Sequence, residues 1–571
     1  MLIKDILKKI IPLQIRIKLR DRLNASEHAL HRAYKFFVGY KFSKKYDEKY
    51  ILSEINEFPR KPLISIVILN PGQTTIFNTL ETVYNQFYTN IELIVVADKK
   101  EALEFTKKNT IAYQNISGNL NDMLLKATGE YIGILYAPDE LTLDALYELT
   151  KTILGKSPDV LYTDNDTFYK KDRYINPNYK PDFSPFTLLS QNYIDNFCLF
   201  KTTFLRGFLS DEPLENIEHY DLILKATEKT NKIVHLPKIL YHKYVGPYLA
   251  NNTVSPYENG SQKRTVEEAL KRRTIKAELI KTPFKNIIRV KRTIEGNPKV
   301  SIIIPFKDKP DLLDVCLKSI VNLSSYQNFE IIGISNNSVE EKTFALMERY
   351  SAKDSRIVFY ENNIPFNFST LNNFAVSKAK GEQIILLNND IEIISKDWIE
   401  ALLEYSQLKE VGVVGAKLYY PNNKIQHAGI IIGLRGLAGH SHKMADRADL
   451  GYQGRLNVVQ NISGVTAACV MLKKQLYLEV GGLEEKLKVA FNDVDLCLKI
   501  QEKGYMNIFT PYCEAYHYES ITRGVEDSFE KIARIHFEMN YIKNRYRKIL
   551  EEGDPYYNLN LTDKYEDFSV K

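Results

Sequence analysis

The sequence predicts an α/β protein in which two similar domains, each built on a mostly parallel sheet, follow one another along the chain. Four short patterns occur twice in the same order, and their offset grows along the chain because the second copy carries insertions. A repeat this long indicates duplicated domains, since solenoid repeats are only ~20–50 residues long. The paired patterns lie at 65–68 and 301–304, 127–130 and 379–382, 220–225 and 494–499, and 241–242 and 516–517.

Short apolar segments alternate with amphipathic ones in both copies, which indicates βαβ units. We expect buried strands at 64–69, 91–96 and 131–135, and again at 302–304, 330–334 and 383–387. The predicted organisation is a helical N-terminal segment at 1–60, a first domain at 61–245, a linker with a charged helix at 246–297, a second domain at 298–525, and a C-terminal helix and tail at 526–571.

The composition is that of a globular chain, with 44% hydrophobic and 26% charged residues. The net charge of +6 is small and does not favour a nucleic-acid partner. Five cysteines without a CxxC pair indicate a reducing compartment and exclude a disulfide framework or a structural zinc site. No apolar stretch approaches ~18 residues, and the first residues lack the apolar core of a signal peptide. We therefore expect a cytoplasmic protein.

The N-terminal segment at 1–22 carries seven lysines and arginines against two aspartates. Its apolar residues repeat at helical spacing as far as Pro12. A basic amphipathic helix of this kind can lie in the headgroup layer of an anionic membrane, or it can pack its apolar stripe on the protein itself. Both interpretations stay open.

Polar side chains follow the predicted strands of the second copy. In doubly wound sheets, ligands bind at the carboxyl ends of the strands. Oxygen and imidazole ligands there could hold a divalent cation against a diphosphate. The chain has no GxxxxGK[ST] motif, and no GxGxxG opens a helix after a strand. The residues concerned are Pro305, Asp308, Asn336, Asn388, Asn389, Asp390, Asp493, Asp495 and His517.

With these motifs the second copy resembles inverting family-2 glycosyltransferases of the GT-A fold, which is Rossmann-like. It is most similar to the tandem-domain, rhamnosyltransferase-like enzymes of bacterial surface-polysaccharide synthesis, of the capsule and O-antigen type. The first copy resembles their companion domain more weakly, through YTDND, KPDFSP and LYH. The matching stretches of the second copy are VSIIIPFKD, FNFSTLNN, LLNNDIE, VGVVGAKLYYPNNKIQHAG, NISGVTAACVMLKK, FNDVDLCLKI and YHYES.

This resemblance implies transfer of a sugar, with inversion, from a nucleotide-sugar donor to a glycan or lipid-linked glycan acceptor. The enzyme would work as a peripheral protein on the cytoplasmic face of the inner membrane. Asp390 in the DXD motif and His517 would bind Mg²⁺ or Mn²⁺, with Asn388 at the position of the first Asp of the motif. Asp493 would be the catalytic base, and Asp495 would help to orient the site.

The remaining expected donor site follows from the same resemblance. Asp308 and Glu330 would hold the nucleotide base and ribose, with Pro305, Asn336 and Asn389 beside them. Ser335 stands at a position where the family usually has an Asp, so the sequence does not indicate which nucleotide base the donor carries. The histidines of the matching blocks, His427, His440 and His442, are expected to shape the acceptor loop.

Structural interpretations stand beside these roles. Asp493 could be an acid in the first turn of a helix, and His517 could be a buried histidine that packs beside Tyr516. Cys469 and Cys497 lie in apolar surroundings and are expected in the core.

The first copy lacks the corresponding acids. Residues 136–138 (Tyr-Ala-Pro) occupy the register of the DXD motif, and His219 stands where the second copy has Asp493. Because a divalent cation needs oxygen ligands, we expect the first domain to be inactive. Residues 69–72 and 97–100 replace the nucleotide-contacting loops, and one acidic cluster survives at 164–166.

Three other functions compete with this one. Sugar-nucleotide nucleotidyltransferases carry a glycine-rich loop after the first strand, and residues 305–310 contain no glycine. A non-catalytic scaffold of a glycan-assembly complex is disfavoured by the joint presence of Asp390, Asp493, Asp495 and His517. A bifunctional enzyme with two active sites is the third alternative.

Overall fold

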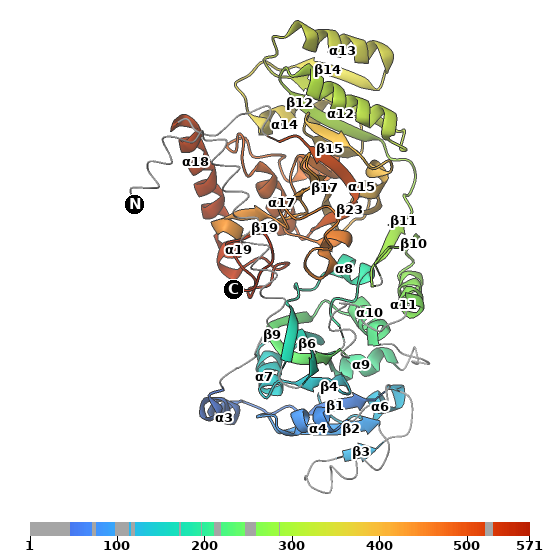
Figure 1. Ribbon diagram of the computed structural model, residues 1–571, viewed down its shortest axis with the longest axis vertical. Helices are drawn as coiled ribbons and strands as arrows, with labels where there is room; N and C mark the ends of the chain where they lie inside the picture. The colour runs from blue at the N-terminus through green and yellow to red at the C-terminus, as the bar shows by residue number, and fades with distance from the viewer. Residues whose placement is uncertain are drawn as a thin grey trace.

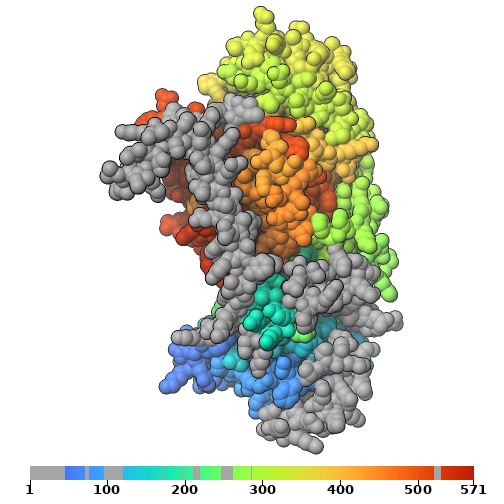
Figure 2. Space-filling model, viewed as in Figure 1, coloured from blue at the N-terminus to red at the C-terminus, as the bar shows by residue number. Residues whose placement is uncertain are grey.

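The computed structural model describes residues 46–70, 76–96, 113–115, 120–170, 173–195, 197–209, 219–245, 259–284, 286–519 and 529–571. The basic segment at 1–22 lies outside these residues. Two α/β domains are stacked along the long axis of the molecule (Figure 1). The linker, in green, lies along one side of them (Figure 2). None of the helices in the described ranges combines the length and the apolar character needed to cross a bilayer.

The first domain is built on a mixed sheet with the strand order β3-β2-β1-β4-β8-β6-β9-β5, and β7 pairs with β6. Its strands are β1 (Ile64–Leu69), β2 (Ile91–Val96), β3 (Tyr113–Asn115), β4 (Tyr131–Tyr136), β5 (Glu140–Leu141), β6 (Val160–Lys170), β7 (Arg173–Asn178), β8 (Cys198–Lys201) and β9 (Ile233–Tyr244). Its helices are α3 (Glu48–Glu57), α4 (Phe77–Tyr84), α6 (Leu120–Lys126), α7 (Ala145–Lys156), α8 (Pro185–Ser190), α9 (Thr202–Leu209) and α10 (His219–Lys229).

The second domain repeats this arrangement, with the order β14-β13-β12-β15-β22-β17-β23-β16. Its strands are β12 (Val300–Phe306), β13 (Phe329–Ser335), β14 (Ile357–Glu361), β15 (Gln383–Leu387), β16 (Ile391–Ile393), β17 (Val411–Tyr419), β18 (Ile425–His427), β19 (Ile430–Ile432), β20 (Ala438–His440), β21 (Gln460–Asn461), β22 (Cys469–Lys473) and β23 (Met506–His517). The helices are α12 (Pro310–Leu323), α13 (Glu341–Lys353), α14 (Phe368–Lys378), α15 (Trp398–Ser406), α16 (Lys474–Glu479), α17 (Asn492–Glu502), α18 (Phe529–Arg545) and α19 (Arg547–Glu552).

The predicted fold class is confirmed, since both domains are α/β and their sheets have the same order. The strands that were predicted from apolar segments form one half of each sheet, and that half is parallel. The pairs are β1–β2, β1–β4, β12–β13 and β12–β15. The other half is mixed, because β8 and β22 run antiparallel to their neighbours. That half carries the last strand of each domain, which ends at the predicted histidine site in the second copy.

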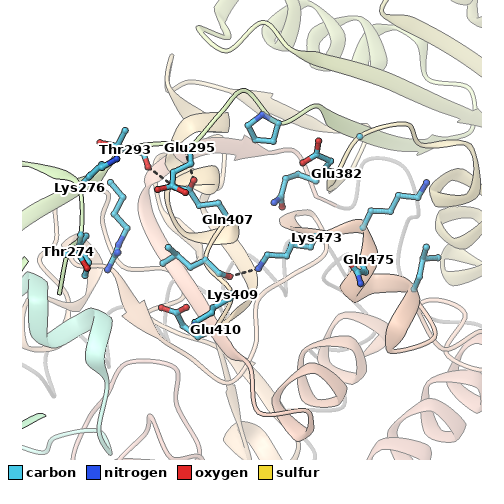
Figure 3. A pocket seen from close by; sticks show the side chains of 18 residues that line it. Thr274, Lys276, Thr293, Glu295, Glu382, Gln407, Lys409, Glu410, Lys473 and Gln475 are labelled. Carbon is cyan, nitrogen blue, oxygen red and sulfur yellow. Dashed lines mark hydrogen bonds between the residues drawn. The ribbon is translucent and has the colours of Figure 1, made fainter. Parts of the chain in front are cut away.

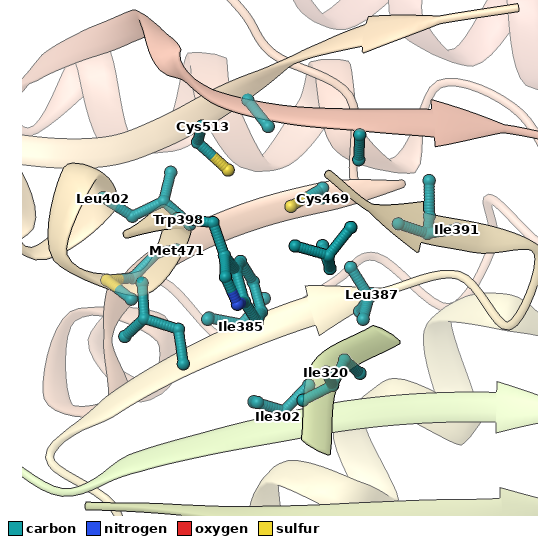
Figure 4. Packing of buried hydrophobic residues seen from close by; sticks show 14 of the residues in the cluster. Ile302, Ile320, Ile385, Leu387, Ile391, Trp398, Leu402, Cys469, Met471 and Cys513 are labelled. Atoms are coloured by element: carbon teal, nitrogen blue, oxygen red, sulfur yellow. The ribbon is translucent and has the colours of Figure 1, made fainter. Parts of the chain in front are cut away.

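The core of the second domain is packed around Trp398 (Figure 4). Its indole is fully buried, and Nε1 donates a hydrogen bond to Ser324 Oγ at 2.8 Å. Cys469 and Cys513 lie in the same apolar cluster, and Cys497 is buried in a second one. The expectation that Cys469 and Cys497 are core residues is confirmed.

A serine, a glutamate and a glycine connect three neighbouring segments in the same way in both domains. Ser301 Oγ donates to Glu330 Oε1 at 2.6 Å and accepts from the Gly381 N–H at 2.8 Å. Glu330 also accepts from the Lys380 N–H at 2.6 Å. In the first domain Ser65, Glu92 and Gly129 make the equivalent bonds. The repeated Ser and Gly of the sequence are therefore structural.

These bonds contradict the expected role of Glu330 in binding the nucleotide. It is the second residue of β13 and lies at the amino end of the strand, whereas nucleotides bind at the carboxyl ends. Its carboxylate is occupied by Ser301 and Lys380 and does not belong to a donor site.

The linker is a packed element. Its charged helix, predicted within 246–297, is α11 (Asn259–Arg272), and its hairpin consists of β10 (Ala277–Lys281) and β11 (Ile288–Arg292). Arg272 forms ion pairs with Glu228 of α10 at 3.0 Å and with Asp221 at 3.1 Å. Arg289 pairs with Glu404 of the second domain at 3.0 Å. The linker thus contacts both domains.

The C-terminal tail also connects the domains. Asp554 accepts from Ser463 Oγ and from the Ile432 N–H, both at 2.7 Å, in the second domain. Four residues on, Asn558 Nδ2 donates to Asp164 Oδ2 of β6 at 2.9 Å. Asp164, which the sequence placed in a surviving acidic cluster, is therefore a buried structural residue.

Gly381→Ala should lower the free energy of unfolding by about 1–3 kcal/mol, because the added Cβ would lie 2.6 Å from the Lys299 carbonyl oxygen. Gly155→Ala in α7 is the matched control, since no atom lies within 4 Å of its added Cβ. The control should raise stability by about 0.4–1 kcal/mol. Thermal unfolding measures both, and equal Tm values for the Gly381 variant and the parent would contradict the tight packing.

Candidate active site

The candidate site is built where the short strand β16 pairs with the end of β23. In this antiparallel pair Ile391 lies opposite His517, and the Tyr518 N–H donates to the Asp390 carbonyl at 2.9 Å. The pairing brings His517 Nε2 to 3.3 Å from Asp390 Oδ1. Asn388 Nδ2 lies 3.4 Å from the same imidazole nitrogen. Three residues predicted from the sequence are thus together.

This group has polar atoms that the described parts of the protein leave without hydrogen-bond partners. They are Asp390 Oδ1, His517 Nδ1 and Asn389 Nδ2, all buried. Buried polar atoms without partners are costly, so such a group is suited to binding a ligand. No group of three or more His, Cys, Asp or Glu suited to a metal occurs among the described residues. Asp390 and His517 therefore fit a hard cation whose other ligands come from a substrate, as substrate phosphates often provide.

Asp493 lies in the first turn of α17. Its Oδ2 accepts from the Ala467 N–H at 3.3 Å, and the carbonyl of the following residue, Ala468, accepts from the Asn388 N–H at 3.0 Å. Residues 467 and 468 thus connect the two parts of the site. Burial raises the pKa of the Asp493 carboxyl, against hydrogen bonds that lower it. A carboxylate with a raised pKa is a better proton acceptor.

Asp495 is placed elsewhere. It is fully buried on the other side of α17, where it pairs with Lys499 Nζ at 3.1 Å. Its Oδ1 accepts from the Tyr546 hydroxyl at 2.8 Å and lies 3.5 Å from Arg545. The structure therefore gives Asp495 a positioning role rather than contact with substrate: it fixes α17, and with it Asp493, against the C-terminal helix.

Asp308 and Asn336 shape the loops after β12 and β13. Asp308, with φ of 48°, accepts from the Val339 N–H at 2.8 Å through Oδ1. Asn336 Nδ2 donates to the carbonyls of Asn362 and Ile364 at 2.8 and 2.9 Å. Both lie at the carboxyl edge of the sheet, as predicted, and Pro305 is buried in β12 beside them.

The three histidines of the matching blocks fall into two environments. His427 Nδ1 lies 2.8 Å from His440 Nδ1, close to His517. His442 instead stacks on Phe568 of the tail, with 4.3 Å between ring centroids, and its Nε2 accepts from the Tyr452 N–H at 2.9 Å. No pattern in the sequence indicates the pairing of His427 with His440.

The first domain keeps a carboxylate that the sequence register had missed. His242 lies opposite Glu140, just as His517 lies opposite Ile391, so Asp139 and not Pro138 corresponds to Asp390. One extra residue between the strands caused the difference. Asp139 accepts from the Tyr244 N–H at 2.8 Å and from the Tyr241 hydroxyl, and burial raises its pKa to about 7.

His242 of the first domain is bonded as well, through Nδ1 to Asp166 Oδ1 at 2.5 Å. The counterparts of Asp390 and His517 are therefore both engaged by protein groups.

A cavity of about 880 Å³ lies away from this site (Figure 3). Gly381 and Gln383 line it at the amino end of β15, whereas Asp390 follows the carboxyl end of that strand. The linker hairpin contributes Lys276 and Thr293 to its wall, and Lys473 donates to the Leu408 carbonyl across it. Its position excludes it as the site of the Asp390 chemistry.

Comparison with known proteins identifies one domain and two long relatives. Residues 301–480 match the family described as Glycosyl transferase family 2. The uncharacterized protein y4gI of Sinorhizobium fredii is 37% identical over 543 residues, which are 90% of this chain and 60% of that protein. The O-antigen biosynthesis protein RfbC of Myxococcus xanthus is 32% identical over 527 residues, 88% of this chain and 40% of that protein. The chain thus spans 60% or less of the length of these relatives.

Among solved structures, GalNAc-T7 with UDP, GalNAc and Mn²⁺ is 14% identical, with a TM-score of 0.34, over 41% of this chain and 45% of that one. The structure of S. aureus TarS 1–349 with UDP-GlcNAc is 18% identical, with a TM-score of 0.29, over 37% of this chain and 66% of that one.

Asp495→Asn should lower the free energy of unfolding by about 3 kcal/mol, because it leaves Lys499 and Arg545 without their buried counter-charge. Glu479→Gln is the control: its pair with Lys503, beyond the end of the same helix, is about half exposed and should contribute less than about 1 kcal/mol. Chemical denaturation measures both. Equal losses for the two variants would contradict the positioning role.

Proposed function

Because residues 301–480 form a glycosyltransferase family 2 domain, we propose that the chain is an inverting glycosyltransferase of surface-polysaccharide synthesis. It would move a sugar from a nucleotide-sugar donor to a glycan or lipid-linked glycan acceptor, of the capsule or O-antigen type. The observation that carries the proposal is the pair Asp390–His517, which has polar atoms without hydrogen-bond partners and is connected to Asp493 through residues 467 and 468. The name of the RfbC relative supports the pathway class.

The residues divide the chemistry between them. Asp390 and His517 would hold Mg²⁺ or Mn²⁺, which neutralises charge on the leaving diphosphate when bound. Asn388 and Asn389 offer amide groups beside them to the donor. Asp493 accepts the proton of the attacking acceptor hydroxyl as that oxygen bonds to the anomeric carbon. A single displacement of this kind inverts the anomeric configuration.

We propose that the first domain does not catalyse transfer and instead holds the acceptor or a partner protein. In support, Asp139 and His242 are already bonded to Tyr241, Tyr244 and Asp166, which leaves no free ligand pair for a cation. A lipid-linked acceptor implies a membrane surface. The basic segment at 1–22 is the proposed contact with anionic lipid on the cytoplasmic face.

The direct experiment incubates the full chain with UDP-, GDP- and dTDP-sugars and Mn²⁺ and measures donor hydrolysis. One donor should be hydrolysed, and EDTA should stop the reaction. Hydrolysis of none would favour the non-catalytic scaffold.

Asp390→Asn should lower donor hydrolysis by about 100-fold or more, since a cation on a phosphoryl oxygen contributes several kcal/mol to the transition state. The Tm should change little, because Oδ1 makes no hydrogen bond that the variant would lose. Asp139→Asn, at the same register of the first domain, is the matched control and should leave hydrolysis unchanged. Loss of activity in that control would instead support the bifunctional enzyme.

Asp493→Asn should lower kcat by about 10²–10⁴-fold while donor affinity stays the same, because a base acts only in the transition state. Steady-state kinetics and donor binding by calorimetry separate the two effects. His219→Asn, at the equivalent position of the first domain, should change neither. If donor affinity falls as steeply as kcat, Asp493 is a binding residue.

A further inference from the structure

His427 and His440 face one another through their Nδ1 atoms, and only one proton can lie between these two nitrogens. His427 ends β18 and His440 ends β20, and their Nδ1 atoms lie 2.8 Å apart. Two N–H groups cannot point at one another at this distance, so one Nδ1 donates and the other accepts.

The backbone decides which ring donates. His427 Nε2 lies 3.3 Å from the Gly429 nitrogen and 3.3 Å from the Thr466 nitrogen, and both N–H groups point at it. His427 Nε2 is therefore an acceptor without a proton, and its proton is on Nδ1. That proton is donated to His440 Nδ1, so His440 carries its own proton on Nε2.

His440 Nε2–H is then a donor that the described protein does not use. His427 is fully buried, whereas His440 is partly exposed, and no hydrogen bond of its Nε2 occurs among the described residues. Burial lowers the pKa of His440 to about 4 and also lowers the pKa of His427 well below its usual value, so both rings are neutral near pH 7.

The position of this donor follows from its neighbours. Thr466, whose N–H faces His427, also donates its hydroxyl hydrogen bond to Asp493. His517 is near enough to lower the pKa of both His427 and His440, and Lys443 and Glu519 also lie near His440. In the proposed enzyme Asp493 faces the acceptor hydroxyl and His517 faces the diphosphate. The His427–His440 pair has neighbours near each of them, so it borders the sugar that lies between the hydroxyl and the diphosphate.

We infer that His440 donates a hydrogen bond from Nε2 to a hydroxyl of the transferred sugar, and that His427 is a positioning residue that fixes the tautomer. The inference rests on the proposed transferase function and adds a specificity residue to it. A neutral N–H donor suits a hydroxyl oxygen, and a site that donates to a substrate hydroxyl rejects analogues that lack it.

The test uses the full chain, Mn²⁺ and the nucleotide sugar that the wild type hydrolyses. His440→Ala should lower kcat/KM by about 100-fold, at the lower end of the range found for single donors at a reacting centre. His440→Gln, which keeps an N–H donor, should stay within about fivefold of the wild type.

A second measurement compares nucleotide-sugar donors that each lack one hydroxyl of the sugar. A purely structural role of His440 would not change how the enzyme discriminates among these donors. The wild type should be slowed by one such deletion, and His440→Ala should be insensitive to the same deletion. If His440→Ala discriminates among these donors as the wild type does, the contact does not exist and the inference is wrong.

His427→Gln tests the positioning role. Because His427 acts through His440, the double variant His427→Gln/His440→Ala should be no slower than His440→Ala alone. Additive losses would show that His427 acts independently. Thermal unfolding of each variant identifies those that fail to fold.

His442→Gln is the matched control on the same loop, since both of its ring nitrogens contact the protein itself. It should lower Tm and leave kcat/KM within about twofold below that temperature. A loss equal to that of His440→Ala would assign the effect to loop placement and overturn the inference. If the wild type hydrolyses no nucleotide sugar, the proposed function fails and this inference falls with it.

Discussion

The pairing of β16 with β23 is the constraint on which the candidate site depends. β16 is only three residues long, yet it places Ile391 opposite His517 and so fixes Asp390 beside the imidazole. β23 itself is held by a parallel pair with β17 and follows α17, the helix that carries Asp493. A shift of this register by one residue would move every side chain of β16 to the other face of the sheet.

The two domains show how one frame supports different chemistry. Their strand orders correspond, and the bonds between Ser, Glu and Gly recur in both. The difference lies in hydrogen bonding at the histidine. Asp139 is held by Tyr241 and Tyr244, whereas Asp390 has an oxygen without a hydrogen-bond partner. A carboxylate whose acceptors are filled stabilises a fold, and one with a free acceptor is available to a ligand.

Parts of the chain outside the two sheets keep the site in place. Asp495 ties α17 to Tyr546 at the C-terminal helix. Farther along, Glu566 of the tail accepts from the His440 N–H at 3.3 Å and pairs with Arg435 at 3.3 Å. The tail thus holds the strand of His440 while Asn558 holds Asp164 of the first domain. The same tail therefore contacts both the candidate site and the first domain.

The sequence by itself determined the α/β class, the duplication, the apolar strands of the parallel half-sheets, the buried cysteines, and the grouping of Asn388, Asp390 and His517. Each of these depends on local pattern or on position at a strand end. Only the tertiary structure decided that Glu330 lies at the amino end of β13, that Asp495 contacts Tyr546, and that Asp139 is the counterpart of Asp390. The same is true of the contact between His427 and His440. These facts depend on strand register and on which face of a helix is covered, and both are set by packing between segments far apart in the chain, which local periodicity does not contain.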